Sequence, residues 1–244
     1  MRVAVISDIH GNLPALEAVL SDVSRERVDR IISCGDVASG PLPVETLQVL
    51  RGLADARFVR GNADRALVAG FDGSQMPRLK GPGFDWCSSQ LTREDRDFLA
   101  SFAETIAIDV DGLGRVLFCH GSPRSDEEIM TARTPEERLG EFLAGVDAAV
   151  VVCGHTHMPF DRKVGRVRVI NPGSVGMPYG EPGAFWAVLG PEIEFRRTDY
   201  DRPAAADRIR KSAWLEANEF ARENVLTVPT IEDAMAFLTK AGGP

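Results

Sequence analysis

Four histidines are the only imidazoles in the chain, and each follows an apolar run that ends in a short polar motif. The motifs are Asp8-Ile9-His10-Gly11, Cys119-His120-Gly121, Gly154-His155-Thr156-His157, and the histidine-free pair Gly35-Asp36 and Gly61-Asn62-Ala63-Asp64. Imidazole, carboxylate and neutral amide oxygen together suit Mn²⁺, Fe, Co²⁺ or Zn²⁺. One such histidine is more commonly a packed or surface residue. Because all four histidines lie in or near motifs of this kind, together with Asp8 and Asp36, the sequence predicts a metal site.

The elements that must position these residues alternate in the first half of the chain. Apolar strands are predicted at Arg2–Ser7, Arg30–Cys34 and Arg57–Val59, with helices after Asn12 and over Val44–Leu53. Such βαβ units imply a mainly parallel sheet whose strands end at one edge. Ligand sites in open α/β sheets collect at that edge. We therefore expect the polar motifs to converge there.

The second half favours antiparallel hairpins. The predicted hairpins pair Thr105–Asp109 with Val116–Cys119, Phe160–Val164 with Arg166–Ile170, and Ala184–Leu189 with Glu192–Arg197. The remaining predictions are a strand at Ala148–Cys153, helices at Arg93–Phe102 and Pro135–Leu143, and a loop from Gly70 to Gly83. Together these elements predict an α/β fold with two packed mixed sheets flanked by helices, a four-layer α/β/β/α sandwich.

The chain after about Arg202 has a different pattern. Ala204–Asn224 is predicted as one amphipathic helix, and Thr230 begins a second helix with Asp233 at capping-box spacing. We expect residues 201–244 to form a C-terminal helical extension, packed on the main domain or on a partner subunit. A homo-oligomer is therefore possible.

Composition limits the classes of protein that fit. The formal net charge of −8 argues against an extended nucleic-acid-binding surface, which would normally show a basic stripe. The longest apolar run, Val146–Cys153, is too short to span a bilayer, and the N-terminal strand meets Asp8 early. The four cysteines form no CxxC pair and suit buried, reduced thiols. A cytoplasmic protein with no membrane partner is expected.

The five polar motifs, in this order, resemble those of the calcineurin-like metallophosphoesterase superfamily. Asn171-Pro172-Gly173-Ser174-Val175-Gly176 and His120-Gly121-Ser122-Pro123-Arg124 look like the compact bacterial and archaeal, phosphodiesterase-like branch of this superfamily. The resemblance covers roughly Met1 to Thr198 and implies a metallophosphoesterase domain over residues 1–200.

The resemblance also implies a ligand set for two divalent metal ions, whether Mn²⁺, Fe, Zn²⁺, Co²⁺ or Ni²⁺. It assigns Asp8, His10 and His157 to one ion, and Asn62, His120 and His155 to the other, with Asp36 bridging them. Two divalent ions contribute four positive charges and the two aspartates return two. The site would stay positive within an acidic protein, and it would bind a phosphate without a basic surface.

The mechanism implied by this arrangement is attack on phosphorus by a metal-bridging hydroxide, formed because the metals lower the pKa of a shared water molecule. The residues predicted to be catalytic are Asp36, Asn62, Asp64 and His120. Asp64 would orient a metal ligand, although a structural role in its turn is nearly as well supported.

One position departs from the commoner family pattern. Many members of the superfamily have a histidine, thought to protonate the leaving group, where this chain has Ala63. No fifth histidine replaces it. The compact branch often lacks that residue too, so activity is not excluded.

The residues predicted to bind substrate are Arg60, Asn62, Arg124 and Ser174. Guanidinium groups match phosphate oxygens, although surface ion pairs explain both arginines equally well. The resemblance places Asn171 and Ser174 beside the metals. Phe71, Trp86 and Tyr179 fit local packing better than stacking on a base or aryl group.

The function expected from these features is hydrolysis of a small phosphodiester or a nucleotide-type phosphate ester, with a small phosphoester as the binding partner. Two alternatives stay open. One is a protein Ser/Thr phosphatase, which would need a wide groove. The other is a catalytically weak regulator that binds metal or a nucleotide, and Ala63 is the feature that motivates it.

Overall fold

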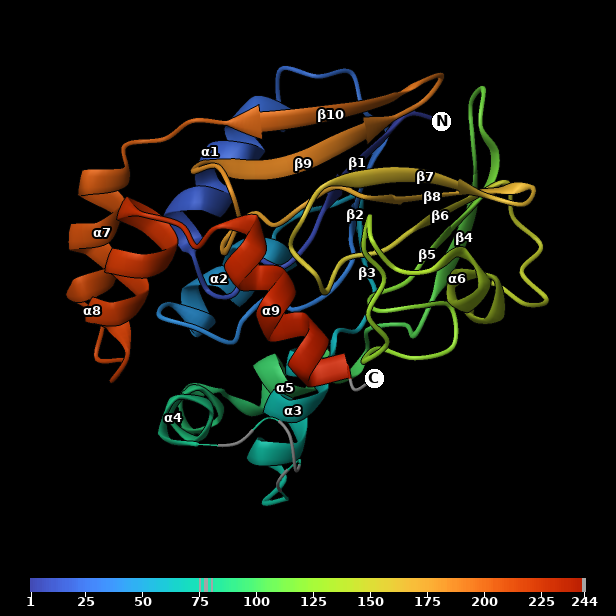
Figure 1. The fold of residues 1–244 in the computed structure, drawn as a ribbon. Coiled ribbons are helices and arrows are strands. Elements are labelled where there is room, and N and C mark those ends of the chain that lie inside the picture. The colour runs from blue at the N-terminus through green and yellow to red at the C-terminus, as the bar shows by residue number, and fades with distance from the viewer. Residues whose placement is uncertain (75, 77–78, 80, 243–244) are drawn as a thin grey trace.

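The computed structural model describes residues 1–74, 76, 79 and 81–242, and contains two five-stranded sheets (Figure 1). The first sheet has the order β10-β9-β1-β2-β3, with β1 (Val3–Ile6), β2 (Arg30–Ser33), β3 (Ala56–Phe58), β9 (Ala184–Leu189) and β10 (Ile193–Thr198). The second has the order β4-β5-β6-β8-β7, with β4 (Ile106–Val110), β5 (Gly114–Phe118), β6 (Val150–Val152), β7 (Phe160–Val164) and β8 (Val167–Asn171).

Both sheets are mixed, with a parallel centre. Strands β1, β2 and β3 run parallel to one another, and so do β5, β6 and β8. The hairpin β9–β10 joins the first sheet antiparallel to β1, whereas β4 and β7 are antiparallel edges of the second sheet. The three parallel strands of each sheet therefore end on the same side of that sheet.

Side chains alternate along β1 between two hydrophobic layers. Val3 and Val5 are buried between the two sheets, with Phe118 and Val152 of the second sheet. Ala4 and Ile6 belong instead to the core between the first sheet and its helices. This period of two is the pleat of a strand buried on both faces.

Helices cover the outer face of each sheet. Helix α1 (Leu13–Val23) and helix α2 (Pro43–Arg51) pack on the first sheet, and α6 (Glu136–Phe142) packs on the second. The Asn12 side chain caps α1 by accepting a hydrogen bond from the Ala15 N–H at 3.3 Å. The expected four-layer α/β/β/α sandwich is confirmed.

Two helices replace part of the predicted loop from Gly70 to Gly83. Helix α3 (Asn62–Phe71) and helix α4 (Pro82–Gln90) occupy its ends, and α5 (Arg93–Ala100) follows. Helix α3 was not expected from the sequence, because Asn62 and Asp64 serve both the site and the first turn of this helix. Asp64 also starts the helix, since its carboxylate accepts the Gly61 N–H at 2.9 Å. Residues 75, 77–78 and 80 of this predicted loop lie outside the described residues.

The prediction of one helix over Ala204–Asn224 is wrong. The segment folds into α7 (Arg202–Arg210), a turn, α8 (Ala217–Phe220) and the π-helical η1 (Ala221–Leu226). An unbroken helix would run away from the body at about 1.5 Å per residue. The turn instead returns Phe220 and Val225 to the core that contains Ile209 and α1.

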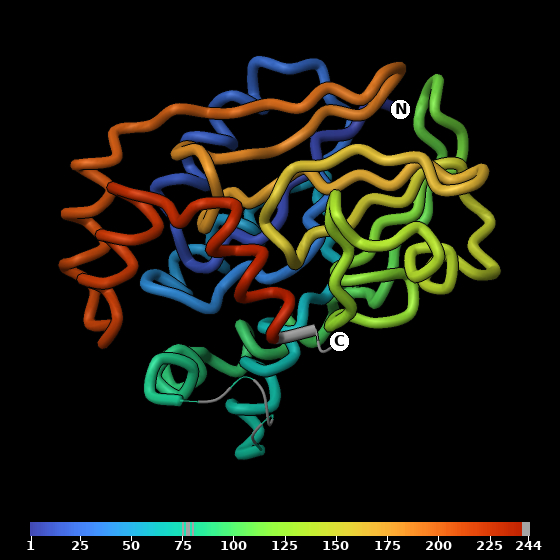
Figure 2. The backbone as a smooth tube through the Cα atoms, viewed as in Figure 1, coloured from blue at the N-terminus to red at the C-terminus, as the bar shows by residue number. Residues whose placement is uncertain are grey.

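Helix α9 (Ile231–Gly242) ends the chain, and Thr230 caps it as predicted, by accepting the Asp233 N–H at 3.1 Å. Figure 2 shows the tail running back along α7 and then crossing the front of the molecule as α9. Within the described residues, no helix is both long enough and apolar enough to cross a membrane.

Candidate metal centre

The predicted ligands all lie just beyond the ends of parallel strands. Asp8 and His10 follow β1, Asp36 follows β2, and Asn62 follows β3. His120 follows β5, and His155 and His157 follow β6. The two sheets therefore bring together side chains from five strands along one edge, as the sequence pattern predicted.

The ligand loops share an unusual backbone conformation. Within the described part of the chain, the non-glycine residues with positive φ are Asp8 (54°), His10 (48°), Asp36 (54°), His155 (66°) and His157 (59°). Left-handed backbone is disfavoured for L-residues and tends to be kept at functional sites, where the surrounding structure holds it in place. Here every one of these residues is a predicted metal ligand.

Hydrogen bonds between the loops hold this conformation. The Asp8 N–H donates to the Gly35 carbonyl and the His10 N–H donates to the Asp36 carbonyl, each at 3.0 Å. Ser174 also holds the Asp8 loop, because its hydroxyl donates a hydrogen bond to the Asp8 carbonyl at 2.7 Å. Gly61 must be glycine because a Cβ there would collide with the Asp36 carboxylate.

The first group of ligand atoms belongs to Asp8, His10 and His157, which lie within 4.8 Å of one another. The Nε2 atoms of His10 and His157 are 3.2 Å apart. The Nδ1 of His157 faces the Met177 carbonyl at 2.8 Å, and the Nδ1 of His10 faces the Ser39 hydroxyl at 2.9 Å. A carbonyl partner requires the proton on Nδ1 and leaves Nε2 free to bind a metal.

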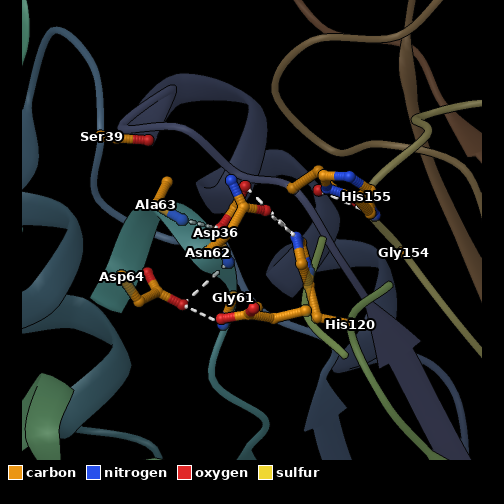
Figure 3. A network of polar contacts seen from close by, with 12 residues as sticks. Asp36, Ser39, Gly61, Asn62, Ala63, Asp64, His120, Gly154 and His155 are labelled. Carbon is orange, nitrogen blue, oxygen red and sulfur yellow. Dashed lines mark hydrogen bonds and ion pairs between the residues drawn. The ribbon is translucent and has the colours of Figure 1, made fainter. Parts of the chain in front are cut away.

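The second group consists of Asp36, His120 and His155 (Figure 3). The Asn62 amide oxygen joins it, 2.9 Å from the His120 Nε2. The Nδ1 of His120 donates to the Cys34 carbonyl at 2.7 Å, which again directs Nε2 toward the centre.

One oxygen of Asp36 lies between the two groups. Its Oδ2 is 3.8 Å from the His10 Nε2 and 3.4 Å from the His120 Nε2. Its Oδ1 accepts the Ala63 N–H at 2.8 Å, which fixes the orientation of the carboxylate. This position is the one that a bridging ligand would occupy.

Asp64 lies behind Asp36 and touches only backbone donors of the site loops. It accepts the N–H groups of Asp36, Val37 and Gly61, each at 2.9 Å (Figure 3). Burial, and then the nearby charge of Asp36, raise the pKa of Asp64 to about 7. The geometry fits a residue that positions the ligand loops.

Electrostatics at the centre depend on burial and on close charges of both signs. Burial lowers the pKa of His120, but Asp36 outweighs it and the pKa rises to about 10. Burial and the neighbouring His120 lower the pKa of His155 to about 4. Burial raises the pKa of Asp36, but the histidines, His120 foremost, bring it well below its usual range. The buried nitrogen and oxygen donors fit divalent cations.

A cavity of about 900 Å³ opens on this centre. Its floor includes His10, Asp36, Asn62, His155 and His157. Its walls come from α4, the turn and helix α8, η1 and α9, with Phe84, Trp214, Glu219 and Phe237 among them. These wall residues were not expected from the sequence, although Glu216, Glu219, Phe220, Glu223 and Asn224 recur at intervals of three or four residues.

The predicted substrate-binding residues lie in different places. Asn62 lines the cavity, whereas Arg60 and Arg124 are not among its lining residues. Arg60 pairs with Glu104 at 3.0 Å, and Arg124 pairs with Glu128 at 2.7 Å while its guanidinium lies over the Phe142 ring. Both arginines thus form ion pairs with glutamates, which was the alternative to contact with a phosphate. Ser174 is fully buried and uses its hydroxyl within the Asp8 loop.

The other sequence candidates have structural roles, except Tyr179. The Asn171 amide donates to the Gly154 carbonyl at 2.7 Å, which braces the loop before His155. Phe71 and Trp86 are partly buried and pack against the core between the first sheet and its helices. Tyr179 lines the cavity and stacks on the His157 ring, with centroids 5.5 Å apart.

The pattern of calcineurin-like phosphoesterase superfamily domains matches residues 1–191, which include every predicted metal ligand. The chain belongs to this superfamily. Members bind divalent metal ions, and the two ligand groups described above are candidate positions for them in this member.

Individual relatives agree with this membership. A metallophosphoesterase structure from Sphaerobacter thermophilus is 30% identical with a TM-score of 0.72, and the match covers 93% of this chain and 98% of that chain. An uncharacterized protein of Methanocaldococcus jannaschii is 29% identical over 87% of this chain and 95% of its own length. The phosphodiesterase YfcE of Escherichia coli is 24% identical over 79% of this chain and 89% of its own length.

Proposed function

We propose that this superfamily member hydrolyses a small phosphodiester with two divalent metal ions. The observation that carries the proposal is the position of the Asp36 Oδ2, which lies between two groups of candidate ligands at the floor of a cavity. Phosphodiesterase relatives support the reaction class. The mixture of imidazole, carboxylate and amide donors favours Mn²⁺, Fe, Co²⁺, Ni²⁺ or Zn²⁺.

The proposed roles follow the geometry. Asp8, His10 and His157 would hold one ion; Asn62, His120 and His155 would hold the other; and Asp36 would contact both. When bound, the ions supply a water molecule acidic enough to ionise near neutral pH and positive charge that attracts a phosphate. Asp64 would keep the Asp36 and Asn62 loops in register through its three backbone hydrogen bonds.

Hydrolysis adds water across one P–O ester bond, and the departing alkoxide must gain a proton. Ala63 lines the cavity, and the four histidines of the chain all stand in the candidate ligand groups. The protein therefore offers no uncommitted imidazole for that proton. This favours esters whose leaving groups are already weak bases.

Turnover of bis(4-nitrophenyl) phosphate tests the proposal against both alternatives. We expect hydrolysis that is abolished by chelation and restored by Mn²⁺, with about two metal ions bound per chain by mass spectrometry. His120→Ala is the matched inactive variant. Turnover of phosphoserine peptides in preference to the diester would instead indicate a protein phosphatase. Full metal occupancy without turnover of either substrate would indicate a regulator.

A further inference from the structure

The cavity at the metal centre is completed by residues that lie outside the family domain. That domain ends at residue 191, yet a large part of the lining follows it in sequence. The residues of the extension that line the cavity are Trp214, Glu216, Glu219, Phe220, Glu223, Asn224, Phe237, Leu238 and Lys240. The extension therefore decides what surrounds the part of a substrate that projects away from the metals.

One face of the α8–η1 segment turns toward the cavity. Glu219 and Phe220 of α8 and Glu223 and Asn224 of η1 line the cavity, and Glu216 joins them from the turn before α8. The opposite side carries Ala217, Ala221 and Val225, which are buried in the main core. The acidic face is thus held in place by packing on its other side.

The turn that leads into α8 contacts helix α4 at the cavity wall. The Trp214 indole N–H donates to the Gly83 carbonyl at 3.3 Å. The Glu216 carboxylate occupies the space beside Gly83, since a Cβ on that glycine would lie 2.5 Å from its Oε1. Gly83 itself lines the cavity. These contacts place the Glu216 carboxylate at the cavity surface.

The charge of this wall is opposite to that expected for a polyphosphate site. Among the described residues that line the cavity beyond the predicted metal ligands, four are glutamates and Lys240 is the basic one. Glu127 pairs with Arg65, and Glu223 pairs with Arg222. Glu216 and Glu219 form no close ion pair within the described part of the chain, although the charge of Arg222 is near enough to Glu219 to interact with it.

Aromatic rings accompany these carboxylates. Phe84, Tyr179, Trp214, Phe220 and Phe237 all line the cavity, and the rings of Trp214 and Phe220 meet edge to face with centroids 5.6 Å apart. Aromatic faces combined with carboxylates attract organic cations, above all quaternary alkylammonium groups, which have no N–H to donate to water and are weakly hydrated.

We infer that the cavity accepts a phosphodiester with one alkylammonium ester arm, and that the C-terminal extension supplies the site for that arm. The inference rests on the proposed function, because the metal centre must hold the phosphate. A phosphodiester brings a single negative charge, which the centre can neutralise. Its cationic arm would then face Glu216, Glu219 and the aromatic rings, whereas a polyphosphate chain would be repelled there.

Two chromogenic diesters test the inference, because they differ only in charge. One is 4-nitrophenyl phosphorylcholine, and the other is 4-nitrophenyl 3,3-dimethylbutyl phosphate, in which carbon replaces the ammonium nitrogen. We expect kcat/KM to favour the choline ester by about tenfold or more at low ionic strength. The preference should shrink in about 0.5 M salt, since salt screens exposed charges.

Substitutions in the cavity wall test which residues cause the preference for the charged ester. Glu216→Gln combined with Glu219→Gln should bring the ratio of the two kcat/KM values close to one, and Phe237→Leu should lower it in part. Phe237 is 64% exposed, so its replacement should not disturb folding. Asp207→Asn is the matched control: it removes one charge from α7, which does not line the cavity, and should leave the ratio unchanged.

The source of the ammonium ester is tested with two natural forms of the same headgroup. We expect turnover of free glycerophosphocholine, slower than that of the nitrophenyl ester because both of its leaving groups are alkoxides. We expect none of phosphatidylcholine in vesicles, because side chains of α4 and α9 stand among the cavity walls. Equal turnover of the vesicles would overturn the assignment to a small free diester.

Equal kcat/KM values for the charged and neutral esters would overturn the inference. So would a ratio that survives in the double glutamate variant. Either result leaves the proposed function standing as long as both esters are hydrolysed. If neither ester nor bis(4-nitrophenyl) phosphate is hydrolysed by the metal-loaded protein, the proposed function itself fails.

Discussion

The Nε2 atoms of His10 and His157 lie 3.2 Å apart although 147 residues separate them in the chain. With its proton on Nδ1, each imidazole would direct a lone pair into the space between the rings, and two facing lone pairs repel each other. A shared cation removes that repulsion, which is the strongest geometric argument for a metal at this position.

Asp36→Asn should reduce activity more than Asp8→Asn. The Asp36 Oδ2 lies close to ligand nitrogens of both groups, whereas Asp8 belongs to one. We expect the Asp36 variant to lose metal at both positions, and the Asp8 variant to lose it mainly at one. Metal content and kcat measured side by side decide this. Two retained ions and near-normal turnover in Asp36→Asn would refute the bridging role.

Metal affinity should rise with pH well beyond the range of an ordinary histidine. The pKa of His120 is raised to about 10, because Asp36 more than offsets the effect of burial, so His120 holds a proton in the metal-free protein at neutral pH. A metal must displace that proton, and apparent affinity should increase by about tenfold per pH unit for one proton.

Calorimetry with Mn²⁺ between about pH 6 and pH 8.5 measures this slope. Repeating it in buffers of different ionisation enthalpy counts the protons released. A plateau above about pH 7, where histidine with its usual pKa is already neutral, would contradict a raised His120 pKa.

Ala63→His should help poor leaving groups selectively. Without a side-chain acid, the rate should depend steeply on the basicity of the leaving group, being fast for nitrophenyl and slow for alkyl esters. A positioned acid contributes about 10²–10⁴-fold, and the introduced histidine should give less because nothing orients it. kcat/KM for a series of aryl and alkyl diesters in both proteins provides the comparison. A shallow dependence in the unmodified protein would reveal another proton donor.

Ile209→Ala should destabilise the whole molecule. Ile209 of α7 is fully buried in the same core as α1, and truncating such a side chain costs about 2–5 kcal/mol. Urea denaturation gives the free energy of unfolding. Leu215→Ala, at a position 69% exposed in the same extension, is the control and should change stability by about 0.5 kcal/mol or less. Equal effects of the two changes would mean that the extension is not integral to the core.

The division of the chain into two domains near residue 200 stays a prediction. The extension packs on the main domain as expected, but it also forms part of the cavity wall, which was not expected. The extension was predicted from its amphipathic pattern to pack on the body, and Ile209 and Phe220 do lie in the main core. The sequence did not indicate that Trp214 and Phe237 would reach the cavity. Apolar periodicity reports only that a face is covered, and not which site lies beside it.

The sequence by itself predicted the candidate ligand residues and indicated the strand ends that carry them. Asp8 and Asp36 follow apolar runs of one sheet, and parallel strands allow those runs to end only on a common side, whereas the packing of the two sheets brings His120 to them. Local sequence also determined the helix start at Thr230, because its cap involves residues three apart.

The tertiary structure alone decided the surroundings of that edge. Glu104 and Glu128 engage Arg60 and Arg124, so both arginines are committed outside the cavity lining. The turn between α7 and α8 sends Glu216 and Glu219 back toward the cavity. Such contacts join residues far apart in the chain, and their outcome depends on packing of the whole core. The apolar pattern of a strand repeats over a few residues, so it does not predict contacts between residues far apart in the chain.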